Sequence, residues 1–203
     1  MNCTRFLLVG VVALALGRVS SSVLTQDSET PPEPYEVAEA YQVYAAILQS
    51  VSPPWPKTQK EFFIRTETGD VPCGASDQFG EKEAAEVAEA IDDYVRMNKK
   101  TWLLQNHLPI DMPYDLVPRD DTSNGLEKFH ELHPDAAGWT EFSAVGFSAD
   151  RSIAAVSVMN WCSSVRECGN GNGTIGLGAS RVLVKKNGKW QPLKNGRGCQ
   201  AMR

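Results

Sequence analysis

The chain has 203 residues, 42% of them apolar and 22% charged, and a formal net charge of −5. These proportions are those of an ordinary globular protein. The acidic total disfavours a nucleic-acid partner, because phosphate backbones repel negative surfaces. No segment beyond residue 22 is long and apolar enough to cross a membrane.

The N-terminus has the layout of a cleavable secretory signal. Arg5 precedes an uninterrupted apolar stretch over residues 6–17, and small residues continue to Ser22. This stretch is shorter than the roughly 20 residues that span a bilayer. We predict a signal peptide over residues 1–22 and a secreted or periplasmic mature protein, with an uncleaved anchor or a misread start as the alternatives.

The mature chain is short enough to predict one domain rather than two. Residues 23–34 are polar and contain prolines, which indicates a flexible lead-in. Residues 35–203 are predicted to form a single α+β domain.

Helical spacing of apolar residues dominates the first half of that domain. Residues 35–51 predict an amphipathic helix that ends before the prolines at 53, 54 and 56. Residues 61–68 are aromatic and β-branched and predict a strand. Residues 81–104 predict a second helix, with glutamates early and lysines late. Residues 106–124 indicate irregular chain, and 126–132 a short helix.

The last third is typical of β-structure. Residues 140–148 and 152–161 predict two strands around a turn, and residues 180–186 and 189–193 flank Asn187-Gly188, a strong hairpin signal. We expect an α+β fold whose N-terminal amphipathic helices pack on a C-terminal antiparallel β-meander of three to four strands.

Four cysteines remain after signal cleavage, and an even number in an exported chain predicts two disulfides. The sequence allows three connectivities, and we favour Cys162–Cys168 with Cys73–Cys199. A zinc site is the competing interpretation, but Cys-x5-Cys is not a usual zinc spacing.

A glycine-rich loop lies between Cys162 and Gly178. Its glycines match G-x-G-x-x-G, but a β-rich stretch follows where the dinucleotide fold needs a helix, so we expect no nucleotide cofactor. A polar loop on a rigid scaffold is a common recognition surface. The predicted interaction residues in and beside this loop are Trp161, Arg166, Asn170 and Asn172.

The segment LEKFHELHPD gathers carboxylates and histidines that could hold one zinc ion or serve a hydrolase: Glu127, His130, Glu131, His133 and Asp135. A di-metal site would need a second helical pair, which the chain lacks. The chain also lacks a G-x-S-x-G elbow. We therefore expect no catalytic residue, no metal and no cofactor, and keep a hydrolase at this region as the alternative.

Charge is unevenly distributed. Residues 181–203 hold seven Lys or Arg and no acidic residue, whereas residues 23–180 hold 11 basic and 25 acidic ones. The basic tail either rests on the protein's own acidic helices or contacts an anionic surface or an envelope protein.

Three segments resemble a family of uncharacterised exported bacterial proteins: SAVGFSADRSIAAVSV (143–158), WCSSVRECGNGNG (161–173) and LVKKNGKW (183–190). In that pattern a strand–turn–strand leads to a cysteine-glycine loop and a final K-x-G-x-W strand. The resemblance, over roughly residues 125–192, implies export and a C-terminal meander but no activity. The leading hypothesis is a non-catalytic binding domain at the cell envelope. The alternatives are an exported hydrolase using the region from His130 to Asp135, and a disulfide-braced enzyme inhibitor.

Overall fold

The structure is a computed structural model that describes residues 31–50, 62–69, 71, 79, 85–162, 175–194 and 198–202. All of these lie in one compact unit, Pro31–Arg203. The helices within these ranges are α1 (Ala38–Ser50), α2 (Ala85–Met97), α3 (Arg119–Ser123) and α4 (Gly125–Leu132). None of the helices in the described ranges has the length and hydropathy to traverse a bilayer.

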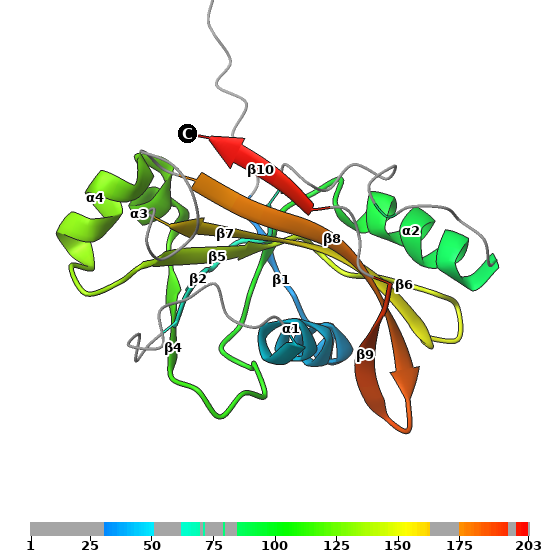
Figure 1. Cartoon of the computed structure of the whole chain (residues 1–203). Helices are drawn as coiled ribbons and strands as arrows, with labels where there is room; N and C mark the ends of the chain where they lie inside the picture. Colours follow the sequence, from blue (N-terminus) through cyan, green and yellow to red (C-terminus); the bar gives the residue numbers. More distant parts are fainter. Residues whose placement is uncertain are drawn as a thin grey trace, which may run out of the picture. The chain divides into compact units, whose positions relative to one another are not determined.

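Most strands form one mixed sheet of eight, in the order β10-β8-β7-β5-β2-β4, with β6 added beside β7 and β9 beside β8 (Figure 1). Its strands are β2 (Phe62–Arg65), β4 (Tyr114–Val117), β5 (Gly138–Phe142), β6 (Gly146–Phe147), β7 (Ile153–Cys162), β8 (Ile175–Lys186), β9 (Lys189–Lys194) and β10 (Gly198–Met202). A separate parallel pair joins β1 (Glu33–Pro34) to β3 (Trp102–Leu103).

The expected meander of three to four strands is wrong. The molecule is α+β, but its large sheet also recruits short strands from the N-terminal half, because β2 pairs in parallel with both β4 and β5. β4 and α3 lie in residues 106–124, where irregular chain was expected. A four-residue strand gives too short a pattern to be distinguished from a loop by periodicity.

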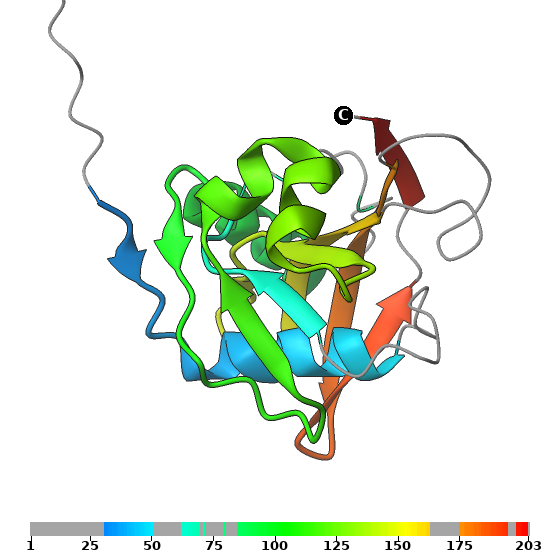
Figure 2. The same cartoon turned by 90° about the vertical axis from the view of Figure 1, so that its left-hand side faces the viewer.

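Helices cover both faces of the sheet (Figures 1 and 2). α1 lies on one face, and α2 and the α3–α4 pair lie on the other. Along β7, Ala154, Val156 and Val158 join the core beneath α1, while Ala155 and Met159 join the cores beneath α2 and α4. A strand buried on both faces needs apolar residues at nearly every position, which explains the continuous apolar run of β7.

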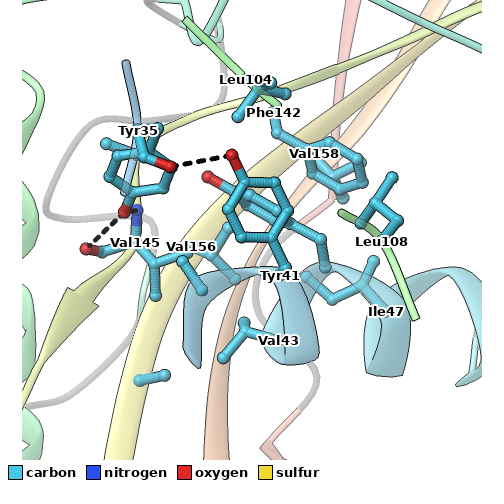
Figure 3. Packing of buried hydrophobic residues seen from close by; sticks show 14 of the residues in the cluster. Tyr35, Tyr41, Val43, Ile47, Leu104, Leu108, Phe142, Val145, Val156 and Val158 are labelled. Atoms are coloured by element: carbon cyan, nitrogen blue, oxygen red, sulfur yellow. Dashed lines mark hydrogen bonds between the residues drawn. The ribbon is translucent and has the colours of Figure 1, made fainter. Parts of the chain in front are cut away.

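The core beneath α1 is organised by tyrosines (Figure 3). The Tyr41 hydroxyl donates to the Tyr35 carbonyl oxygen at 2.8 Å, and the Tyr35 hydroxyl accepts from the Val145 N–H at 2.9 Å. The Tyr44 hydroxyl donates to the Ser143 carbonyl oxygen at 2.8 Å, and its ring stacks on Phe142. These bonds satisfy buried polar groups and fix α1 against the sheet.

The hairpin predicted at Asn187-Gly188 is confirmed as the β8–β9 connection. Both turn residues have positive φ, 51° and 74°, as a type I′ turn requires. β9 and β10 follow one another along the same edge of β8, the edge opposite β7. β9 is therefore an edge strand, and it contains Pro192, a residue confined to such edges.

Candidate binding groove

A groove of about 650 Å³ lies between α1 and the β8–β9 hairpin. Both views place β9 beside α1 (Figures 1 and 2). The lining residues come from α1, from the segment before β4 and from the hairpin: Gln42, Ala45, Ala46, Gln49, Ser50, Pro109, Gly188, Lys189, Trp190, Gln191 and Pro192.

The α1 side of the groove follows directly from the helical repeat. Gln42, Ala45, Ala46 and Gln49 have the spacing i, i+3, i+4 and i+7, so they share one face of the helix. Tyr41, Val43, Tyr44 and Ile47 are buried in the core on the other side. Ala45 and Ala46 have only methyl side chains, so the middle of this face is shallow. The exposed amide side chains of Gln42 and Gln49 lie at its two ends.

Trp190 lines the hairpin side of the groove and is only 7% exposed. Its ring packs 5.9 Å from that of Phe147, and the Lys185 ammonium lies 5.7 Å from the ring centroid. The indole Nε1–H is buried and has no hydrogen-bond acceptor in the described part of the chain. A buried donor without a partner is uncommon in native proteins.

The backbone of Trp190 also faces away from its neighbouring strand. In an antiparallel ladder, hydrogen-bonded and non-hydrogen-bonded pairs alternate. Lys186 and Lys189 close the two-residue turn and form a hydrogen-bonded pair, so the next pair, Lys185 and Trp190, does not exchange bonds. The Lys185 N–H accordingly donates to the Ser152 carbonyl oxygen at 2.8 Å, away from β9. The Trp190 N–H therefore points outward from the sheet edge.

The charge at this edge is positive. Lys189 is the ionisable residue of the groove lining, and neither it nor Lys186 has a carboxylate partner among the residues described. Lys185 is different, because it forms an ion pair with Glu39, which also lies 3.5 Å from Arg151. Exposed lysines on an edge strand also oppose pairing with a second copy.

The histidine segment does not gather a reactive cluster. The His133 ring packs 4.7 Å from both Phe63 and Phe129, and its Nε2 lies 3.6 Å from Asp121 Oδ2. Glu131 pairs with Lys128 at 2.6 Å on the exposed side of α4. Among the residues that the structure places, no three His, Cys, Asp or Glu side chains come together as metal ligands would. His133 thus acts in the packing of α4.

Most of the predicted interaction loop, including Arg166, Asn170 and Asn172, lies outside the described residues. Trp161 is described and is a core residue, 1% exposed, with its ring 6.2 Å from that of Trp139. It packs beneath α4 rather than on a recognition surface.

Cys162 is the last residue of β7, and Cys199 lies in β10. They cannot bond to each other. Cys162 pairs with Ile175 of β8, and Ile175 pairs on its other side with Met202 of β10. Cys199 is therefore two strands away from Cys162 and a further three residues along β10. Each offset is roughly 10 Å, beyond the ~7 Å limit between the Cα atoms of a disulfide. Cys73 and Cys168 lie outside the described residues, so the favoured pairing stays a prediction.

A buried ion pair sits on the opposite side of the sheet from the groove. Arg65 Nη1 lies 2.8 Å from Glu141 Oε1, and the Trp139 indole N–H donates to the same oxygen at 3.0 Å. Both charged side chains are nearly inaccessible, at 8% and 1% residue exposure. The pair joins β2 to β5.

Sequence reasoning missed the groove, although two signals for it are present. Residues 35–51 are predicted only as an amphipathic helix, and Asn187-Gly188 only as the turn of a hairpin. Their juxtaposition depends on the position of α1 across the sheet, which periodicity does not encode.

Comparison with known proteins yields no match to a family model, to a curated protein or to a solved structure. The chemistry of the groove is therefore inferred from its own residues.

Proposed function

We propose that this protein is an exported, non-catalytic binding domain whose ligand site is the groove between α1 and the β8–β9 hairpin. The observation that carries the proposal is the backbone of Trp190, a groove-lining residue of β9 whose N–H and C=O point away from β8, opposite the polar face of α1. A bound ligand that supplies an acceptor would pair with this outward N–H.

The lining supports binding rather than catalysis. It combines three amide side chains, one hydroxyl and a single ionisable residue, Lys189. General acid–base or nucleophilic catalysis needs a titratable pair or a nucleophile next to a base, and the groove residues do not supply one. Glutamine side chains donate and accept hydrogen bonds, so they suit a neutral polar ligand backbone.

A groove-filling substitution tests this proposal. Ala46→Trp places a large side chain on the outer face of α1, where the wild-type residue is partly exposed. The matched control is Ala149→Trp, at an exposed alanine in the turn before β7. The probes are arrays of synthetic peptides and of cell-envelope glycans, incubated with the labelled mature domain.

We expect Ala46→Trp to weaken binding by about tenfold or more, the equivalent of losing roughly 1.4 kcal/mol. The Ala149→Trp control should bind like the wild type. Equal binding by Ala46→Trp, or no ligand on either array, would overturn the proposed site.

Export is a separate part of the proposal, supported by the signal-like residues 1–22. Its test is N-terminal sequencing of the protein recovered from the periplasm or the medium of its own host. A mature chain that begins close to residue 23 is the expected result, and a retained N-terminus in the cytosolic fraction contradicts it.

A further inference from the structure

We propose that the ligand of this groove is an extended, acidic peptide that adds a short strand to the outer edge of β9. This inference rests on the proposed function and names the chemical class of its ligand. It combines three features of one small region: a strand edge that no other described strand pairs with, amide side chains opposite it, and lysines without a carboxylate partner among the described residues.

The strand edge supplies the main-chain contacts. The Trp190 N–H and C=O point away from β8, as its non-hydrogen-bonded pairing with Lys185 requires. Two residues further on, Pro192 has a carbonyl acceptor but no N–H. β9 can therefore bind only a short strand, through the two groups of Trp190 and the carbonyl of Pro192.

The opposite side of the groove fits a peptide lying along β9. Gln42 and Gln49 are seven residues apart on α1, a rise of about 10 Å along the helix. An extended peptide covers the same distance in about three residues. Two amides at this spacing can hydrogen-bond to backbone groups that the β9 edge does not use.

Charge selects the kind of peptide. Lys186 and Lys189 are exposed at the start of the edge, without a carboxylate partner in the described ranges. Acidic side chains on the incoming peptide would be attracted to them, which favours the encounter and fixes the register.

The same charge disfavours a second copy of this chain. Pairing of two β9 edges would bring the lysines of both hairpins together, and like charges on facing strands are destabilising. A glycan is disfavoured by the burial of Trp190, which at 7% exposure leaves its ring face covered rather than available for sugar stacking.

Backbone N-methylation of the peptide provides the sharpest test. The probe is a synthetic peptide in which glutamate alternates with threonine, titrated into the full mature domain by calorimetry. A series of peptides carries one N-methyl group at successive positions. Since alternate residues of a strand face its partner, methylation should weaken binding by about tenfold or more at every second position inside the bound segment. The intervening positions should tolerate it.

Lys189→Gln tests the charge. We expect this substitution to weaken binding of the acidic peptide about threefold, the effect of losing one exposed ion pair. The control Lys128→Gln removes an exposed lysine from α4 and should leave binding unchanged. A peptide with lysine in place of glutamate should bind the wild type more weakly than the acidic one.

The outcomes separate the two proposals. Absence of acidic-peptide binding at millimolar concentration, or an N-methyl pattern without the period of two, overturns the peptide inference. If a glycan binds and Ala46→Trp abolishes its binding, the groove remains the site but its ligand is not a peptide. If sedimentation shows that the free protein dimerises and Ala46→Trp prevents it, the occupant is a second copy and the peptide inference is wrong.

Discussion

Glu141 is a single side chain whose loss should lower the free energy of unfolding substantially. Its carboxylate is 1% exposed and is held by the Arg65 guanidinium and the Trp139 indole. Removing one partner of a buried ion pair leaves the other charge uncompensated, at a cost of about 3–5 kcal/mol. We therefore expect Glu141→Gln to lower the free energy of unfolding by that amount in urea titrations.

The control for this substitution is Glu127→Gln on the exposed side of α4. Its effect should stay within about 0.5 kcal/mol. Equal stability of the two variants would show that the Arg65–Glu141 pair contributes nothing to the fold.

The tyrosines beneath α1 predict a loss of stability at alkaline pH. Burial raises the pKa of Tyr35. It also raises the pKa of Tyr44 well above its usual value. In the unfolded chain both phenols ionise near pH 10 (about the usual pKa). Their contribution to stability is therefore complete below about pH 10 and declines as the pH rises beyond it.

The measurement is phenolate absorbance recorded together with circular dichroism during an alkaline titration. We expect part of the tyrosine signal to appear only as the secondary structure is lost. Ionisation of all five tyrosines in one step near pH 10, with the fold intact, would contradict this assignment.

At the scale of elements, the contact between α2 and β6 depends on a glycine. A Cβ atom at Gly146 would overlap the Tyr94 backbone nitrogen and the Ala90 carbonyl oxygen of α2. Gly146→Ala must therefore displace the helix, at a cost of about 1–3 kcal/mol for overpacking.

Gly198→Ala is the matched substitution on β10, where an added Cβ would lie 3.7 Å from the Gly178 carbonyl oxygen, an ordinary contact. Thermal unfolding should show a clear decrease in Tm for Gly146→Ala and little change for Gly198→Ala. A similar Tm for both variants would mean that α2 does not pack on β6 as described.

Elements with a strong local pattern were predictable from sequence, and elements defined by long-range pairing were not. The turn between β8 and β9 was located because only residues tolerant of positive φ fit a type I′ turn. The parallel pairing of β2 with β4 and β5 was missed, since these strands have four or five residues and their partners lie far apart in sequence. Helix and strand types were encoded locally, whereas the size and order of the sheet were not.

At the scale of the whole molecule, the sheet restricts which cysteines can pair. Because Cys162 and Cys199 cannot pair with each other, two of the three connectivities remain for Cys73, Cys162, Cys168 and Cys199. We predict Cys162–Cys168 with Cys73–Cys199, to be tested by peptide mapping under non-reducing conditions. A Cys73–Cys162 peptide would contradict the local staple around the glycine-rich loop.

The candidate site illustrates what a sequence leaves out at this scale. The predicted surface was the loop after Cys162, chosen for its glycines and polar residues. The groove instead combines α1 with β9, which are separated by most of the domain in sequence. Trp190 differs from the core residues Trp139 and Trp161 in lining the groove. Such a feature exists only once the chain is folded.

Hydrogen exchange at the Trp190 amide tests the central claim most directly. The outward N–H of this edge residue has no acceptor among the described residues, so a bound ligand strand would supply one. With saturating acidic peptide, we predict that exchange at Trp190 slows by about tenfold or more, while the amides of α4 are unchanged. Unchanged exchange along β9 in a saturated complex, with protection elsewhere, would contradict the assignment of the groove as the binding site.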